Sequence, residues 1–132
     1  MAWQGYKIVS KLGEGGMATV YKAIQESLQR PVAIKILAAN MKELPEIEER
    51  FENESLIIAK LTHPHIIHVI DRGLTSKGRP YFVMEYVEGL SLEECINRDK
   101  LNFNQKIDTL VQVCKALTYA HKNGVIHRDI KP

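Results

Sequence analysis

The stretch Leu12-Gly-Glu-Gly-Gly-Met-Ala-Thr-Val20 decides how the rest of the chain is interpreted. Its glycines would let backbone N–H groups approach a phosphate, because glycine has no Cβ to stand in the way. A dinucleotide-binding turn would continue into a helix, whereas here residues 19–24 alternate like a strand. We therefore predict a hairpin loop that lies over phosphates. An ordinary Gly-rich hairpin stays open as the alternative at this point.

After the Gly-rich stretch, Lys35 lies in the segment Val32-Ala-Ile-Lys-Ile-Leu37. The segment is apolar on both faces of the predicted strand, where a cation is costly unless it is paired. Alternation puts Ala33 on the same face as Lys35, and its small side chain would leave room for a flat ring. The alternative is a lysine whose ammonium group reaches solvent at a sheet edge.

Glu54 falls inside the apolar stripe of a predicted helix. The other members of the stripe are Ile47, Phe51, Ile58 and Leu61. Helical spacing places all five positions on one face, so we expect Glu54 to face the core, where a carboxylate needs a partner. Lys35 is the nearest candidate, and a Lys35–Glu54 pair would aim the ammonium group at a bound phosphate. The alternative places Glu54 at the edge of the stripe, in solvent.

The whole chain reads as a sheet followed by helices, which is the α+β class. The strand pattern covers residues 6–12, 19–24, 31–37, 65–72 and 81–86. A helix is expected from Pro45 to about Leu61, and capping boxes at Ser91 and Asn102 open two more. The last of these helices ends at Asn123-Gly124 and carries one apolar face: Ile107, Leu110, Val111, Cys114, Leu117 and His121.

Composition excludes several classes of protein. The 132 residues are 45% apolar and 26% charged, enough for one compact core. The formal charge of +2 comes from 18 basic and 16 acidic residues mixed along the chain, so no nucleic acid or anionic membrane partner is indicated. No apolar run approaches the roughly 20 residues of a membrane-spanning helix, and the start lacks a secretory-signal pattern. Cys95 and Cys114 favour reduced, packed thiols and the cytosol.

Three clustered histidines, His63, His65 and His68, could suggest a metal site. The order of helix, His63-Pro64 and strand favours a turn instead, because proline stops a helix. We therefore expect these histidines to be satisfied by local hydrogen bonds, with no metal bound.

The segment His127-Arg-Asp-Ile-Lys-Pro132 follows the long helix. It places a base, Asp129, and a cation, Lys131, in an irregular stretch where both could meet a substrate. As an isolated hexapeptide it could be a polar surface loop. Its combination with the Gly-rich loop, Lys35 and Glu54 argues against that alternative.

Taken in this order, the motifs resemble the eukaryotic-like protein kinase family, and most of all its bacterial serine/threonine members. They are Leu12-Gly-Glu-Gly-Gly-Met-Ala-Thr-Val20, Val32-Ala-Ile-Lys35, Glu54, His63-Pro64, Phe82-Val-Met-Glu-Tyr-Val87 and His127-Arg-Asp-Ile-Lys-Pro132. The resemblance covers the whole chain. It implies a protein kinase-like fold with an antiparallel small lobe carrying one helix at 1–84, a hinge at 85–89 and the first helices of an α-helical large lobe at 90–132, truncated in the catalytic loop.

The resemblance also implies roles for individual residues. The loop from Gly13 to Ala18 would cover the ATP phosphates, Lys35 would hold the α and β phosphates, and Glu54 would hold Lys35. Asp129 would accept or orient the proton of the substrate hydroxyl, while Lys131 would steady the γ-phosphate. Leu12, Val20 and Ala33 would sandwich the adenine, Met84 would stand at the gatekeeper position, and the backbone of Glu85 and Val87 would bind the adenine edge. The implied cofactor-binding residues are Leu12, Gly13, Glu14, Gly15, Gly16, Met17, Ala18, Thr19, Val20, Ala33, Lys35, Met84, Glu85 and Val87.

The sequence departs from the family pattern at two places. Ala18 stands where the loop often has its third glycine, which is a small-for-small change. The family also expects an Asn and an Asp-Phe-Gly after Pro132, and these two motifs supply the protein ligands of Mg²⁺. We therefore expect no metal ligands within the chain and an exposed apolar face on the helix that begins at Asn102.

Two functions remain in competition. The first is a serine/threonine protein kinase domain that transfers the γ-phosphoryl group of ATP to protein substrates, here truncated at the catalytic loop. The second is a catalytically inactive nucleotide-binding or interaction module built from the small lobe. Intact Lys35, Glu54 and Asp129 favour the first. The expected location is the cytoplasm, and a membrane anchor in a longer parent protein stays open.

Overall fold

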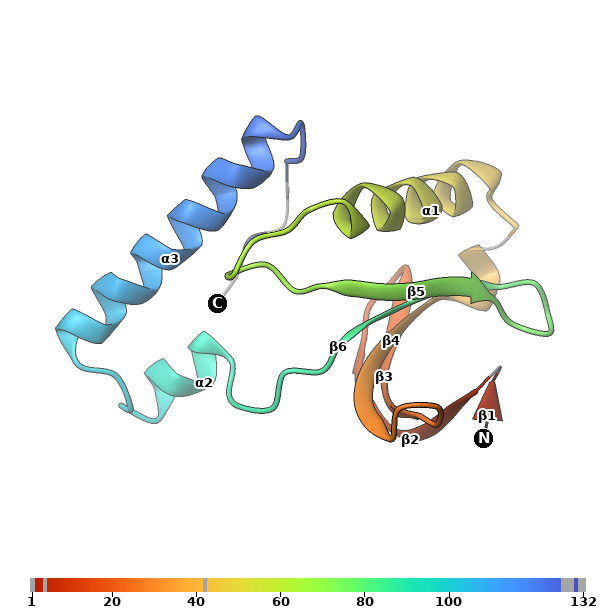
Figure 1. The fold of residues 1–132 in the computed structure, drawn as a ribbon, viewed down its shortest axis with the longest axis horizontal. Coiled ribbons are helices and arrows are strands. Elements are labelled where there is room, and N and C mark those ends of the chain that lie inside the picture. The colour runs from red at the N-terminus through yellow and green to blue at the C-terminus, as the bar shows by residue number, and fades with distance from the viewer. Residues whose placement is uncertain (1, 4, 42, 127–129, 131–132) are drawn as a thin grey trace. The chain divides into compact units, whose positions relative to one another are not determined.

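The computed structural model describes residues 2–3, 5–41, 43–126 and 130. The chain divides into two compact units. The first, the sheet unit, consists of Met1–Lys60 and His68–Tyr86. The second, the helical unit, consists of Leu61–Ile67 and Val87–Pro132. The order predicted from the sequence, a sheet first and helices second, is the order observed (Figure 1).

Within the described residues, six strands form one sheet in the order β1-β2-β3-β4-β6-β5, and every neighbouring pair is antiparallel. Their bounds are β1 Ala2–Trp3, β2 Tyr6–Glu14, β3 Ala18–Gln25, β4 Arg30–Leu37, β5 Val69–Leu74 and β6 Pro80–Glu85. The connections from β3 to β4 and from β5 to β6 are tight turns, in which Gln29 and Gly78 adopt the positive φ that such turns need. The central position of β4 puts its side chains in the middle of both faces.

The sequence located most of these strands and misplaced one boundary. The strand expected over residues 65–72 begins only at Val69, and β1 was not predicted. The residues before Val69 form a turn instead, since the amide of His65 donates to His63 Nδ1 at 3.1 Å and the amide of Ile66 donates to the carbonyl of His63 at 3.2 Å. Local side-chain hydrogen bonds of this kind compete with strand pairing.

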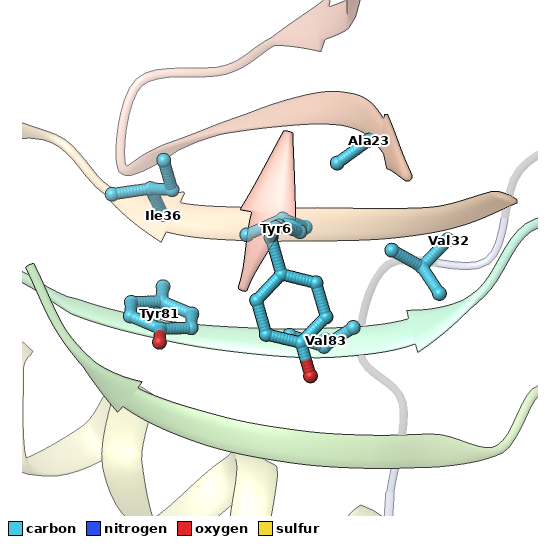
Figure 2. Packing of buried hydrophobic residues seen from close by; sticks show 7 residues of the cluster. Tyr6, Ala23, Val32, Ile36, Tyr81 and Val83 are labelled. Carbon is cyan, nitrogen blue, oxygen red and sulfur yellow. The ribbon is translucent and has the colours of Figure 1, made fainter. Parts of the chain in front are cut away.

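One face of the sheet forms a closed hydrophobic core around Tyr6 (Figure 2). We call it the Tyr6 face, and its buried members are Tyr6, Ala23, Val32, Ile34, Ile36, Tyr81 and Val83. The Tyr6 hydroxyl donates to Asp71 Oδ2 at 2.9 Å, joining β2 to β5 at the far end of the strand order. The sheet therefore curls strongly around this core.

The opposite face carries helix α1, Pro45–Ala59, and we call it the α1 face. Proline at the first turn and the acidic residues Glu46 and Glu48 suit the helix N-terminus. The Phe51 ring packs on Phe82 with centroids 5.2 Å apart, and α1 runs alongside β5 (Figure 1). A short 3₁₀ turn, η1, Ala39–Met41, precedes the helix.

In the helical unit, both capping boxes predicted from the sequence are present. Helix α2 is Leu92–Asn97 with Ser91 as its cap, and α3 is Phe103–Lys122 with Asn102 as its cap. The left-handed end of α3 is also confirmed, because Gly124 has φ +80°. The segment Leu61–Ile67 is tied to α3, since the Thr62 amide donates to the Tyr119 hydroxyl at 3.0 Å.

The apolar face of α3 is exposed, as expected. Ala120 is the one buried residue among the described residues of this helix. The exposed apolar side chains of α3 are Phe103, Ile107, Leu110, Val111 and Val113. Both cysteines are free, but the expectation of packed thiols is wrong for Cys114, which lies exposed on this helix. None of the helices in the described part of the chain has the length and apolar character that crossing a membrane requires.

Candidate nucleotide site

The Gly-rich stretch forms the connection of the β2–β3 hairpin, as predicted. Gly13 pairs with Val20, and the amide of Gly15 donates to the carbonyl of Ala18 at 2.9 Å to close the turn. A Cβ added at Gly13 or Gly16 would meet no atom within 4 Å, and neither residue has a positive φ. The chain's own packing therefore does not demand glycine at these positions. A ligand that approaches the backbone does supply such a reason.

The charge at this loop is partly balanced within the hairpin. Lys11 Nζ lies 2.9 Å from Glu14 Oε2, and this exposed hydrogen bond raises the pKa of Lys11. The carboxylate of Glu14 therefore has a cation beside it. Its repulsion toward a phosphate under the loop is reduced accordingly.

Strand register brings the predicted ring and phosphate residues onto one face. Lys35 lies opposite Val20 on one side and Phe82 on the other, and Ala33 lies opposite Met84 on β6. Directly paired residues of neighbouring strands point to the same side of a sheet. The prediction that Ala33 and Lys35 share a face is confirmed, and that face is the α1 face.

Lys35 lies in the interior of the sheet, half-buried, and not at its edge. Strand β4 is flanked by β3 and β6, so the alternative of a lysine at a sheet edge is excluded. Its Nζ lies 5.7 Å from the centroid of the Phe82 ring, a cation–π contact that stabilises the ammonium group. The Lys35 ammonium group therefore lies over the α1 face, where a phosphate could pair with it.

The expectation that Glu54 faces the core is wrong. Glu54 is exposed, whereas Ser55 is only 3% exposed, and its hydroxyl donates to the carbonyl of Glu52 at 2.7 Å. At 3.6 residues per turn, position 54 lies about 60° to one side of Phe51 and position 55 about 40° to the other. The helix buries the short hydroxyl, which is satisfied on its own backbone, in preference to a carboxylate.

As a consequence, Lys35 and Glu54 do not pair in this structure. The ion pairs formed by described residues include Lys11–Glu14 and Arg98–Glu94. Two open pockets of about 220 and 210 Å³ lie beside Ser55, between α1 and the edge strand β5. Helix α1 is therefore loosely packed on the side away from Lys35.

The end of β6 is fixed by His68. The amide of Glu85 donates to the carbonyl of His68 at 3.0 Å, and the amide of His68 donates to Glu85 Oε1 at 3.0 Å. No signal in the sequence pointed to this reciprocal pair. Met84 is half-buried beside it, and Val87, in the helical unit, is exposed.

The remaining sequence predictions concern metal and catalysis. Within the part of the chain that the structure describes, no group of three or more His, Cys, Asp or Glu side chains could hold a metal ion. A local hydrogen bond joins His65 to His63, as predicted, whereas the prediction is wrong for His68, which pairs with Glu85, 17 residues away. Asp129 and Lys131 lie outside the described residues.

Comparisons with known proteins agree on one family. Residues 6–132 match the family described as protein kinase domain. Over 128 residues the chain is 42% identical to a probable serine/threonine-protein kinase of Clostridium acetobutylicum, covering 96% of this chain and 19% of the relative. It is 41% identical over 131 residues to the serine/threonine-protein kinase PknB of Mycobacterium leprae, covering 96% and 21%.

Solved structures give the same result for the fold. The kinase domain of PknI from Mycobacterium tuberculosis matches with a TM-score of 0.81 at 32% identity, covering all of this chain and 53% of that one. The apo form of PpkA-294 matches with a TM-score of 0.85 at 22% identity, which supports the fold alone. The chain thus spans about a fifth of the curated relatives' length and about half of the solved domains.

Proposed function

The chain belongs to the protein kinase domain family and corresponds to its N-terminal part, and from this premise we propose that its sheet unit is the ATP site of a serine/threonine protein kinase. The family uses ATP and Mg²⁺. The observation that carries the proposal is the position of Lys35, in the middle of the sheet and opposite Val20 of the Gly-rich hairpin. A cation so placed, beside a loop whose glycines the chain itself does not require, fits a polyphosphate.

Different residues of the sheet unit would bind different parts of the nucleotide. The hairpin loop, with Gly13, Glu14, Gly15, Gly16, Met17, Ala18 and Thr19, would cover the phosphates. The α and β phosphates would pair with Lys35. Leu12, Val20 and Ala33 would sandwich the adenine, and Met84 would limit the depth of its pocket. The backbone of Glu85, and beyond it that of Val87, would bind the adenine edge, in keeping with lobes at 1–84 and 90–132 and a hinge at 85–89.

Glu54 would pair with Lys35 only after α1 turns about its axis. Such a turn exchanges Ser55 for Glu54 on the α1 face. The open pockets of about 220 and 210 Å³ beside Ser55 would give room for such a turn. A phosphate near Lys35 would compensate the desolvation of the pair by adding a second charge-assisted contact.

In the catalytic loop, Asp129 would hold the proton of the substrate hydroxyl and Lys131 would neutralise charge on the γ-phosphate. Mg²⁺, when bound with ATP, supplies the further positive charge that phosphoryl transfer requires. Its protein ligands in the family belong to motifs that follow the position of Pro132. We therefore expect residues 1–132 alone to bind nucleotide weakly without measurable transfer to protein substrates.

The proposal is tested first by binding. We expect Lys35→Met to weaken ATP binding by the 132-residue chain about ten- to hundredfold, because a charge-assisted contact to the phosphates is lost. Lys7→Met is the matched control, since Lys7 is an exposed lysine of β2 and should leave affinity unchanged. Fluorescence titration with a labelled ATP analogue measures both. Equal affinity in Lys35→Met and the unsubstituted chain would contradict the assignment.

Catalysis is tested in the full-length protein. Autophosphorylation with Mg²⁺ and radiolabelled ATP is expected, and Asp129→Asn should abolish it, because the amide cannot accept a proton from the substrate hydroxyl. Undiminished labelling in Asp129→Asn would exclude the proposed role of this residue. An unsubstituted protein that binds ATP but never transfers phosphate would favour the inactive module.

A further inference from the structure

A second lysine on the α1 face contacts the end of the sheet unit. Lys22 Nζ lies 4.6 Å from the centroid of the Tyr86 ring, within the range of a cation–π interaction. Both side chains are half-buried. Tyr86 is the last residue of the sheet unit and directly follows Glu85, where β6 ends. Neither the phosphate contact proposed for Lys35 nor the adenine contacts proposed for Glu85 and Val87 involve this cation–π pair.

The strand register explains how Lys22 reaches across the sheet. Lys22 on β3 lies opposite Ala33 on β4, and Ala33 lies opposite Met84 on β6. Tyr86 follows Met84 by two residues and so continues on the same side. Ala33, which lies between Lys22 and Met84 in this register, is 6% exposed.

The residue before Tyr86, Glu85, is also held in place by the protein. Both backbone and side chain of Glu85 are held by His68, through the reciprocal hydrogen bonds of 3.0 Å. Tyr86 is the next residue, and its ring is held by the ammonium group of Lys22. Lys22 lies on β3, so the contact crosses β4 on the same face of the sheet. Residues 85 and 86 are thereby held by His68, which precedes β5, and by Lys22 of β3.

We propose that Lys22 is a positioning residue for nucleotide binding, which acts by holding the Tyr86 ring and thus the backbone that binds the adenine edge. The inference rests on the proposed ATP site. Because Lys22 acts on the adenine end, its loss should weaken adenosine, ADP and ATP equally. Lys35 acts on the phosphates, so its loss should weaken ATP and leave adenosine unchanged. The expected size for Lys22 is about two- to fivefold, as for one partly exposed cation–π contact.

The contact itself is tested by NMR on the 132-residue chain. The ε-methylene protons of Lys22 should be shifted upfield by the Tyr86 ring current. They should return to ordinary lysine values in Tyr86→Leu, while the corresponding protons of Lys7 stay unchanged in both proteins. Lys22 resonances at ordinary values in the unsubstituted chain would overturn the inference.

The function of the contact is tested by titrating adenosine and ATP against Lys22→Met, Lys22→Arg and the control Lys7→Met. We expect a two- to fivefold loss for both ligands in Lys22→Met, recovery in Lys22→Arg, and no change in Lys7→Met. In a double-mutant cycle, Tyr86→Leu should add nothing to Lys22→Met. A structural role alone would not give equal losses for the two ligands with recovery by arginine.

The binding results expected if the role of Lys22 is wrong differ from those expected if the proposed ATP site is wrong. Unchanged affinities in Lys22→Met, together with weaker ATP binding in Lys35→Met, would overturn the role of Lys22 and leave the ATP site standing. A loss for ATP alone in Lys22→Met would also overturn it, because Lys22 would then act on the phosphates. No saturable binding of ATP by the unsubstituted chain would contradict the proposed site and this inference with it.

Discussion

The two faces of β4 are built from alternate residues of one apolar segment, and they differ in how completely they are filled. Val32, Ile34 and Ile36 point to the Tyr6 face, where each is at most 2% exposed. Ala33, Lys35 and Leu37 point to the α1 face, where Leu37 is fully buried against Phe51 and Phe82, while Ala33 is small and the Lys35 side chain is half-buried. Both faces carry a buried cluster, and we propose that the nucleotide binds on the α1 face, where Ala33 and Lys35 lie.

The largest expected effect separates these faces by stability. Ile34→Ala should lower the free energy of unfolding by about 2–5 kcal/mol, because it leaves a cavity in a closed core. Lys35→Met should change it by less than about 1 kcal/mol, since the replacement retains an apolar stem and removes one cation–π contact. Urea denaturation followed by circular dichroism measures both.

The two faces differ in this way only if Ile34→Ala destabilises the chain more than Lys35→Met does. If Lys35→Met unfolds the chain as severely as Ile34→Ala, the Lys35 side chain is itself part of the structural core of the α1 face. In that case the loss of ATP binding expected in Lys35→Met would result from unfolding, and the proposed difference in function between the two faces would be wrong.

Features that depend on a few adjacent residues were predictable from the sequence. The Gly-rich hairpin and the capping boxes at Ser91 and Asn102 are of this kind, because each uses bonds between residues close in the chain. The shared face of Ala33 and Lys35 followed from alternation once the strand was recognised. Most of the sheet, and the side of β4 on which Ala33 and Lys35 lie, could therefore be predicted.

Other features depend on packing that the sequence pattern leaves undetermined. The rotation of α1 is one, since positions 54 and 55 lie on either side of Phe51 and the apolar stripe fits both. The contacts of Lys22 with Tyr86 and of Tyr6 with Asp71 join residues from distant strands, so they emerge only from the strand order. The catalytic Asp129 stays a prediction from the motif.

An intermediate effect is expected where α1 is loosely packed. Ser55→Leu would place an apolar side chain beside the pockets of about 220 and 210 Å³. We expect it to stabilise the sheet unit by about 0.5–2 kcal/mol, as cavity-filling substitutions do. It should also weaken ATP binding, because it holds Glu54 away from Lys35.

Ser55→Ala is the matched control for this substitution. It removes the hydroxyl without filling the pockets, so ATP affinity should stay close to that of the unsubstituted chain. Thermal unfolding and fluorescence titration give the two quantities for each variant. Stronger ATP binding in Ser55→Leu would show that nucleotide binding does not require α1 to turn, and the two faces would then differ less than we propose.

The smallest expected effect lies on the Tyr6 face and depends on pH. Burial, and after it the hydrogen bond to Asp71, raises the pKa of Tyr6 to about 12. Since ionisation is easier in the unfolded chain, the stability this group contributes is complete below about pH 10 and is lost as the pH rises toward about 12. Tyr6→Phe should cost about 0.5–1.5 kcal/mol at pH 7, the usual value of one hydrogen bond.

Tyr6→Phe should also flatten the fall in stability between pH 10 and 12. Burial raises the pKa of Tyr81 as well, so part of the fall should remain in the variant. Urea midpoints measured at pH 7, 10 and 11.5 give the comparison. An identical fall in Tyr6→Phe and the unsubstituted chain would mean that the Tyr6 hydroxyl is already accessible to solvent. The core on this face would then be no more closed than the α1 face opposite.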